Sequence, residues 1–157
     1  MKFISKSLKE TAEAAKKILR QVSAEPRSKA TVAALYGDLG SGKTALVQEV
    51  GKLLGIKEPI QSPTFVIMKR FEILASSEPK RGQKDLRFKS LMHIDAYRLE
   101  QASELEKLGW KEIISNEENL IFIEWPERVG KILPSGTLKV YLKFLDEKTR
   151  EISFGEE

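Results

Sequence analysis

Apolar residues recur every three or four positions near the start of the chain, which predicts an amphipathic helix. The apolar positions of this run are Leu8, Ala12, Ala15, Leu19 and Val22. Ser7 and Glu10 stand three residues apart at its start, the spacing of a capping box. We expect a short strand at residues 3–4 before this helix, and we expect the helix to end before Pro26.

Runs of branched and aromatic residues predict strands along the rest of the chain. The expected strands cover residues 31–36, 64–73, 91–95, 120–124, 137–145 and 150–154. The fourth is continuously apolar, as in a buried parallel strand, and the last two should pair as an antiparallel hairpin. Helices are expected at 45–54 and near 103–109, where Ser103 and Glu106 have capping-box spacing. This order predicts an α/β fold with a mostly parallel central sheet, flanking helices and antiparallel C-terminal strands.

Length and composition are those of an ordinary globular protein. The chain has 157 residues, 41% of them hydrophobic and 32% charged, which fits a single domain over residues 1–157. No apolar run is long enough to cross a bilayer, and residues 1–10 lack the apolar stretch of a signal peptide, so we expect a cytoplasmic protein without membrane contact. The absence of cysteine excludes disulfides, thiolate catalysis and cysteine zinc sites.

The net charge of +4 suggests contact with an anionic molecule. Basic residues gather in the polar stretch 75–89, at Lys80, Arg81, Lys84, Arg87 and Lys89. A solvated loop and a surface for nucleic acid both fit this stretch.

Residues 37–44 have the sequence G-D-L-G-S-G-K-T, which is a complete phosphate-binding loop (P-loop) between an expected strand and an expected helix. Glycines let successive backbone N–H groups face one anion, and the helix N-terminus adds its dipole. Lys43 would reach the β- and γ-phosphates, and the Thr44 hydroxyl would bind Mg²⁺. We expect the Lys43 side chain to project into solvent. The motif predicts a nucleoside triphosphate site formed by Gly37, Asp38, Leu39, Gly40, Ser41, Gly42, Lys43 and Thr44.

Two carboxylates, Asp95 and Glu124, each end an apolar strand. The carboxyl ends of parallel strands open onto one crevice, where the P-loop also lies. A nucleotide-hydrolysing site needs one carboxylate for Mg²⁺ and another that orients the attacking water. Either residue could take either role. His93, the sole histidine, shares a strand face with Asp95, and we expect it to be a hydrogen-bonded structural residue.

Three further positions near these strand ends are candidates for function. Thr64 follows Ser62 and Pro63 in a loop where nucleotide switch proteins place a hydroxyl that senses the γ-phosphate. Trp125 precedes a proline at the rim of the crevice; core packing is the usual role of tryptophan, but this position also suits a partner or substrate contact, which is the interpretation that we favour. Arg98 could neutralise phosphate charge, contact a partner or form a salt bridge.

Four motifs occur in a fixed order: G-D-L-G-S-G-K-T at 37–44, S-P-T-F at 62–65, H-I-D-A-Y-R-L at 93–99 and E-W-P-E at 124–127. Together they resemble the TsaE (YjeE) family, the small bacterial ATPases of tRNA threonylcarbamoyladenosine synthesis. The resemblance covers about residues 3–154 and includes S-E-L-E-K-L-G-W at 103–110. The stretch 75–89 is longer than the corresponding family loop.

The resemblance implies roles for individual residues. Residues 40–44 would hold the ATP phosphates, with Thr44 and Glu124 binding Mg²⁺. Asp95 matches a functionally important aspartate, Thr64 a switch-like threonine, and Trp125 a tryptophan associated with activity in a complex. Family members cover the nucleotide base with the N-terminal segment and a late loop. The candidates for this role here are Thr11 and Arg150, the latter in the turn 148–150.

The resemblance also implies partners. They are the sugar-kinase-like threonylcarbamoyltransferase subunit (TsaD) and its paralogue (TsaB), which modify an adenosine beside the tRNA anticodon. ATP hydrolysis by the small subunit would reset that complex between turnovers, with tRNA involved indirectly.

Other functions of a P-loop protein are open to different degrees. A GTPase is excluded because the chain has no N-K-x-D element for guanine. A small-molecule kinase could use Arg81 and Arg87 as a lid over the phosphates. A nucleotide-dependent binding module would hydrolyse ATP only incidentally. An ATPase assay with and without partners distinguishes the partner-dependent ATPase, the kinase and the binding module.

Overall fold

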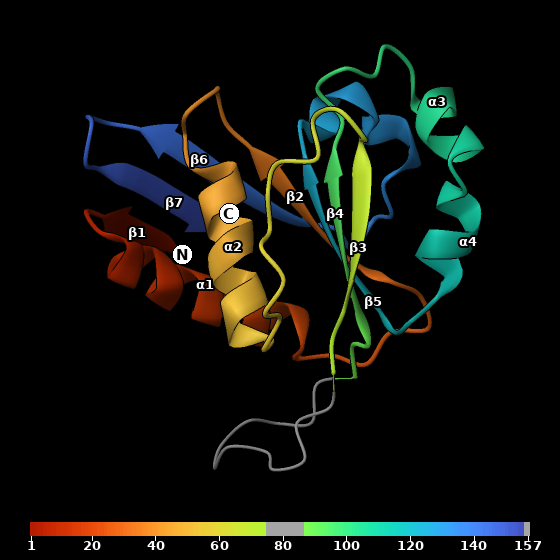
Figure 1. Ribbon diagram of the computed structural model, residues 1–157, viewed down its shortest axis with the longest axis horizontal. Helices are drawn as coiled ribbons and strands as arrows, with labels where there is room; N and C mark the ends of the chain where they lie inside the picture. The colour runs from red at the N-terminus through yellow and green to blue at the C-terminus, as the bar shows by residue number, and fades with distance from the viewer. Residues whose placement is uncertain (75–86, 156–157) are drawn as a thin grey trace.

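A computed structural model describes residues 1–74 and 87–155, and its strands form one seven-stranded sheet (Figure 1). The helices are α1 (Leu8–Val22), α2 (Lys43–Leu53), α3 (Ala102–Lys107) and α4 (Trp110–Ser115), followed by the 3₁₀ turns η1 (Pro126–Arg128) and η2 (Gly130–Ile132). The strands are β1 (Lys2–Ser5), β2 (Thr31–Tyr36), β3 (Met68–Glu72), β4 (Ser90–Asp95), β5 (Asn119–Glu124), β6 (Leu138–Phe144) and β7 (Arg150–Phe154).

The order of strands across the sheet is β1-β7-β6-β2-β5-β4-β3. The central strands β6, β2, β5 and β4 run parallel. Strand β3 pairs antiparallel with β4 at one edge, and β7 and β1 continue the sheet antiparallel at the other. The expected α/β fold, with a parallel centre and antiparallel C-terminal strands, is confirmed.

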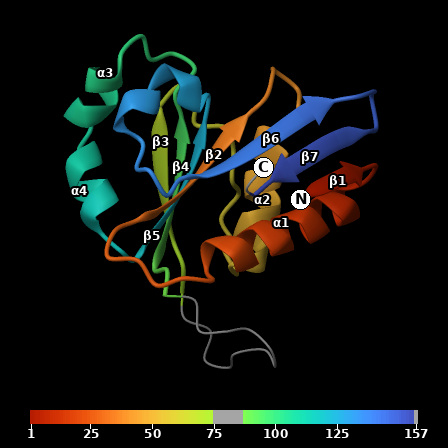
Figure 2. The same ribbon diagram turned by 180° about the vertical axis from the view of Figure 1, so that it is seen from behind.

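Residues of the central strands alternate between two apolar cores. In β5, Leu120 and Phe122 belong to one core, whereas Ile121 and Ile123 belong to the other. Helices α1 and α2 cover the first core, and α3 and α4 lie on the other side of the molecule (Figures 1 and 2). Burial on both faces explains why these strands are continuously apolar.

The same alternation determines where the polar residues of these strands lie. Leu91 of β4 faces the core under α1 and α2, so His93 and Asp95 face that side as well. On β5, Glu124 follows Phe122 on this side. All three polar side chains therefore lie on the face of the sheet where α2 and the P-loop lie.

Helix α1 begins as expected, but its buried stripe differs from the expected one. Ser7 is the N-cap, and its Oγ accepts a hydrogen bond from the backbone N of Glu10 at 3.2 Å. The Glu10 carboxylate accepts from the backbone N of Lys6 rather than from that of Ser7. Leu8 is 63% exposed because it lies in the first turn, at the rim of a pocket. The buried residues are Thr11, Ala14, Ala15, Ile18, Leu19 and Val22.

The expected strand 64–73 is wrong in its first half. Residues 64–66 form a turn, because the backbone N–H groups of Val66 and Ile67 both donate to the Pro63 carbonyl, at 3.1 and 2.6 Å. Ile67 has a φ of 67°, a left-handed conformation that is not compatible with an extended strand. Strand β3 therefore starts only at Met68.

The second capping box lies two residues before its expected position. Glu104, not Glu106, accepts hydrogen bonds from the backbone N–H groups of Glu100 and Gln101, at 2.7 and 2.9 Å. Helix α3 starts accordingly at Ala102.

Most of the basic stretch 75–89 falls outside the described residues, including Lys80, Arg81 and Lys84. Arg87 donates to Thr31 Oγ1 at 2.7 Å and to the carbonyl of Glu25, and Lys89 forms an ion pair with Glu118. Thr31 starts β2, whereas the P-loop follows the end of β2. Arg87 therefore lies at the wrong end of the sheet for the lid of a kinase.

Within residues 1–74 and 87–155, no helix is both long and apolar enough to cross a membrane.

Candidate nucleotide-binding site

The P-loop connects the carboxyl end of β2 to the N-terminus of α2, as the motif requires. Gly40 and Gly42 have φ values of 77° and 98°, which only glycine adopts readily. A side chain at Gly37 would collide with the carbonyl oxygen of Leu142 on β6. Gly42 is the N-cap of α2 and offers no capping side chain, so the first N–H groups of the helix stay available to an anion.

Contrary to expectation, the Lys43 side chain does not project into solvent. Its side chain is held over the loop because Nζ donates to the carbonyls of Gly37 and Asp38, the latter at 2.9 Å, and the residue is only 5% exposed. The ring of Trp125 lies 4.3 Å from Nζ. Burial lowers the pKa of Lys43, and the neighbouring carboxylates, Glu124 foremost, oppose this effect.

Glu124 is fixed by donors from two different elements. Its Oε1 accepts a hydrogen bond from Thr44 Oγ1 of α2 at 2.9 Å and lies 2.8 Å from His93 Nε2 of β4. Glu124 is 3% exposed and His93 is fully buried. His93 is hydrogen-bonded as expected, but its partner is a site carboxylate.

The pair formed by Thr44 and Glu124 fits a magnesium ion. Mg²⁺ in nucleotide sites takes one hydroxyl or one or two carboxylates from the protein, and the other ligands are phosphate oxygens and water. No cluster of three or more His, Cys, Asp or Glu residues suited to a metal occurs among the described residues. A phosphate-linked Mg²⁺ does not need such a cluster.

Asp95 is held by a different set of groups. Its Oδ2 accepts hydrogen bonds from Thr64 Oγ1 at 2.9 Å and from Ser62 Oγ at 3.2 Å, and its Oδ1 accepts from the backbone N of Tyr97 at 2.9 Å. Asp95 pairs with Glu124 in the register of β4 and β5. The structure therefore brings Thr64, Asp95, Glu124 and Thr44 together along one edge of the sheet.

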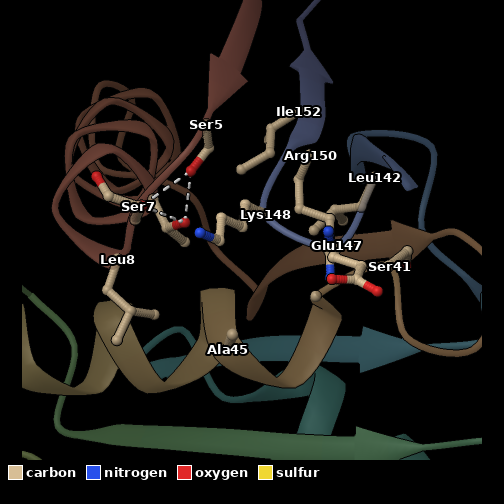
Figure 3. A pocket seen from close by; sticks show the side chains of 12 residues that line it. Ser5, Ser7, Leu8, Ser41, Ala45, Leu142, Glu147, Lys148, Arg150 and Ile152 are labelled. Atoms are coloured by element: carbon tan, nitrogen blue, oxygen red, sulfur yellow. Dashed lines mark hydrogen bonds between the residues drawn. The ribbon is translucent and has the colours of Figure 1, made fainter. Parts of the chain in front are cut away.

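Thr11 and Arg150 line one pocket of about 240 Å³ beside the P-loop (Figure 3). Thr11 Oγ1 lies 2.8 Å from Ser5 Oγ. The pocket also includes residues that the sequence did not predict as part of a binding site, namely Ser5, Ser7, Leu8, Ala45, Leu142, Glu147 and Ile152. One sequence signal was available: Ser7 was expected as a helix cap. The pairing of Ser5 with Arg150 in the register of β1 and β7 was not visible in the sequence.

Aromatic and cationic side chains form a surface next to the P-loop, which we call the aromatic face. It consists of Phe65, Tyr97, Arg98, Trp125 and Arg128. The Tyr97 and Trp125 rings lie 5.0 Å apart, with the guanidinium of Arg128 at 5.8 Å from Tyr97. Arg98 lies 4.5 Å from the ring of Phe65, which is 84% exposed. Among the described residues, Arg98 has no salt bridge.

Trp125 lies between the core and the surface. It has a φ of 58°, is half-buried, and packs against the core on the α4 side as well as over Lys43. Its ring thus links the lysine of the P-loop to Tyr97, which is 40% exposed.

The fold and this arrangement define a P-loop NTPase-like α/β protein. A family model described as "Threonylcarbamoyl adenosine biosynthesis protein TsaE" matches residues 5–152. The chain belongs to the TsaE family, as the resemblance of its motifs implied.

Relatives agree with this assignment. A protein of Nostoc sp. named tRNA threonylcarbamoyladenosine biosynthesis protein TsaE is 39% identical over 126 residues, which cover 77% of this chain and 67% of that protein. A protein of the same name from Treponema pallidum is 30% identical over 153 residues, 98% of each chain. The crystal structure of Bacillus subtilis YdiB matches with a TM-score of 0.68 and 27% identity, covering 98% of this chain and 83% of that one.

Proposed function

We propose that this chain is a cytoplasmic subunit that binds and hydrolyses Mg-ATP for the synthesis of threonylcarbamoyl adenosine in tRNA. The observation that carries the proposal is the 2.9 Å contact between Thr44 Oγ1 and Glu124 Oε1 at the start of the P-loop helix. It joins the last residue of a phosphate-binding motif to a buried carboxylate, the combination that a nucleotide-bound metal needs.

The P-loop supplies the phosphate contacts. Backbone N–H groups of residues 40–44 and the positive end of the α2 dipole favour the triphosphate. Lys43 lies close to the Gly37 and Asp38 carbonyls, and its Nζ would exchange them for phosphate oxygens. Burial lowers the pKa of this lysine, and the neighbouring Glu124 and Asp95 oppose this effect and so favour the charged form that phosphate binding requires.

Thr44 and Glu124 would hold the magnesium ion. When bound, the ion would neutralise the charge that develops on the phosphates during transfer. The Thr44 hydroxyl donates its proton to Glu124 and keeps its lone pairs free for a metal. This contact supports a shared ion, because it holds the two side chains next to each other before nucleotide binds.

Asp95 would orient the attacking water and couple it to the segment 62–67. Phosphoryl transfer depends mainly on positioning, so a carboxylate next to the γ-phosphate needs no unusual basicity. The hydroxyls of Ser62 and Thr64 both contact Asp95 Oδ2, so a movement of this segment would change the orientation of the carboxylate.

The pocket lined by Thr11 and Arg150 would receive the nucleoside. Its lining includes Gly42 and Ala45 of the phosphate loop and helix, and Lys148 from the turn before β7 (Figure 3). A base placed there would extend from the P-loop toward α1.

The aromatic face would contact the partners, the sugar-kinase-like threonylcarbamoyltransferase subunit (TsaD) and its paralogue (TsaB). Aromatic residues and arginine are enriched in the parts of interfaces that contribute most binding energy. Trp125 links this face to Lys43, so the same contact would report the state of the nucleotide site. The tRNA itself would be involved only through these partners.

An ATPase assay with purified protein, with and without the two partner subunits, tests the proposal. We expect Mg²⁺-dependent hydrolysis that the partners increase. Lys43→Ala should abolish nucleotide binding, whereas Lys57→Ala, a change of an exposed lysine beyond α2, should not. Melting curves check that both variants fold, because Lys43 is buried and bonded to two carbonyls.

Two results would overturn the proposal. Transfer of phosphate to a small acceptor without partners would make the chain a kinase. Binding of partners in the ATP form without turnover would make it a nucleotide-dependent binding module.

A further inference from the structure

His93, the sole histidine, is fully buried in β4 and lies beside the carboxylate that we assign to magnesium. Its Nε2 is 2.8 Å from Glu124 Oε1 on the neighbouring strand β5. In the parallel register, His93 pairs with Phe122 and Asp95 pairs with Glu124, so the histidine reaches its partner diagonally across the two strands. The proposed function gives His93 no part in binding or hydrolysis.

The chemistry of the two partners determines which ring nitrogen carries the proton. An ionised carboxylate only accepts hydrogen bonds, so Nε2 must be the donor. His93 Nδ1 is buried and has no hydrogen-bond partner among the described residues. A proton on Nδ1 would be a buried donor without an acceptor, which is costly. A proton on Nε2 satisfies both conditions.

Glu124 Oε1 therefore receives two donors from two rigid elements, Thr44 from α2 and His93 from β4. Two donors at one oxygen fix the rotation of the carboxylate more tightly than one. No described residue donates a hydrogen bond to the other oxygen, Oε2, so that oxygen is left for another ligand.

We propose that His93 is a positioning residue for the magnesium site: its Nε2–H holds Glu124 in the orientation that binds the metal. This inference rests on the proposed function, in which Thr44 and Glu124 bind Mg²⁺. Groups that orient a metal ligand typically change metal affinity by roughly 10–100-fold when they are removed.

Two amide variants separate this role from simple space filling. The side-chain nitrogen of Gln occupies a position like that of Nε2, and the nitrogen of Asn a position like that of Nδ1. His93→Gln therefore keeps a donor toward Glu124, whereas His93→Asn moves the donor to the side without a partner. Both replace a buried ring by a smaller polar group, so a purely structural role predicts similar losses in both.

The measurement is ADP affinity as a function of Mg²⁺ concentration, with ADP affinity in EDTA as the reference. We expect His93→Asn to need roughly 10–100-fold more Mg²⁺ for the same gain in ADP affinity, in line with lost support of a metal ligand. His93→Gln should stay close to wild type, and ADP affinity in EDTA should be unchanged in both. Equal effects of the two variants would overturn the positioning role.

Nitrogen NMR of the wild-type protein gives a second test that needs no variant, because a single histidine yields an unambiguous signal. We expect a proton on Nε2, and a larger change in the Nε2 signal with Mg-ADP than with ADP alone. A ring protonated on Nδ1 alone would overturn the inference. If wild-type protein bound ADP equally well with and without Mg²⁺, the proposed metal site would be wrong instead, which keeps the two failures distinct.

Discussion

The ends of β4 and β5 lie side by side, and each carries a buried carboxylate that faces the P-loop side of the sheet, yet different parts of the molecule hold the two. Glu124 is bonded to Thr44 and His93, both in regular elements. Asp95 is bonded to Ser62 and Thr64, in a segment that also contains the exposed Phe65.

This difference supports the proposed division of tasks between the two carboxylates. A ligand for a metal gains from a fixed orientation, which the core-bound donors of Glu124 provide. Asp95 is instead bonded to hydroxyls near the surface, so a molecule that binds there would change the hydrogen bonds of this carboxylate. Phe65 lies under Arg98 on the aromatic face and directly follows Thr64, which is hydrogen-bonded to Asp95. A partner that contacts Phe65 would therefore be separated from Asp95 by Thr64 alone.

The largest effect is expected for Glu124→Gln. Gln keeps the shape and can still accept hydrogen bonds from Thr44 and His93, but the metal loses its negative ligand. Loss of groups that merely orient a ligand lowers metal affinity by roughly 10–100-fold, so loss of this ligand's charge should lower turnover by more than about 100-fold. Steady-state hydrolysis over a range of Mg²⁺ measures it. Glu117→Gln, which changes an exposed residue near the opposite end of β5, is the control.

For Asp95→Asn we expect the opposite pattern, in which turnover falls but binding is kept. Nucleotide and Mg²⁺ should still bind normally, because the donors around Glu124 are untouched, while turnover falls by about 10–100-fold through lost positioning of water. Equilibrium binding and single-turnover hydrolysis separate the two steps. If excess Mg²⁺ restored Asp95→Asn but not Glu124→Gln, the roles of the carboxylates would have to be exchanged.

Trp125→Ala tests the connection between the aromatic face and Lys43. Complete burial would imply a loss of about 3–5 kcal/mol, but this residue is half-buried, so we expect about 1–2 kcal/mol. That corresponds to a melting temperature lower by roughly 2–8 °C in a chain of this size. Stimulation by partners should be lost, whereas Trp125→Phe, which keeps a ring over Lys43 and beside Tyr97, should retain most of it. If the partners still stimulated Trp125→Ala fully, Trp125 would not be part of the partner surface.

The sequence predicts the parts of this site that depend on local chemistry. The P-loop motif determines its own conformation through Gly40 and Gly42. An apolar strand that ends in a carboxylate indicates that this carboxylate lies at the carboxyl edge of the sheet, where the P-loop also lies. Contacts between distant elements could not be predicted in this way. The approach of His93 to Glu124 depends on the register of β4 and β5, and the pocket at Arg150 depends on β1 pairing with β7.

The segment 62–67 shows a second limit of sequence patterns. Its branched and aromatic residues favour a strand, but Pro63 accepts two backbone hydrogen bonds and Ile67 turns left-handed. Tertiary bonds from Ser62 and Thr64 to Asp95 accompany the turn and outweigh local strand propensity. The exposed position of Phe65 follows from this turn.

The smallest effect is expected for Thr64→Val, which removes one of the two hydroxyls on Asp95 Oδ2 while keeping the shape of the side chain. A hydrogen bond to a charged group contributes about 1.5–3 kcal/mol, but Ser62 still donates to the same oxygen at 3.2 Å and the segment is partly exposed. We therefore expect a loss of about 1 kcal/mol in the barrier for hydrolysis, or roughly fivefold in rate. Thr64→Ser keeps the hydroxyl and should hydrolyse ATP like wild type, and Mg-ADP affinity should be unchanged in both variants. A weaker Mg-ADP affinity in Thr64→Val would mean that the 62–67 segment acts on the metal side of the site, and the separation between the two strand ends would fail.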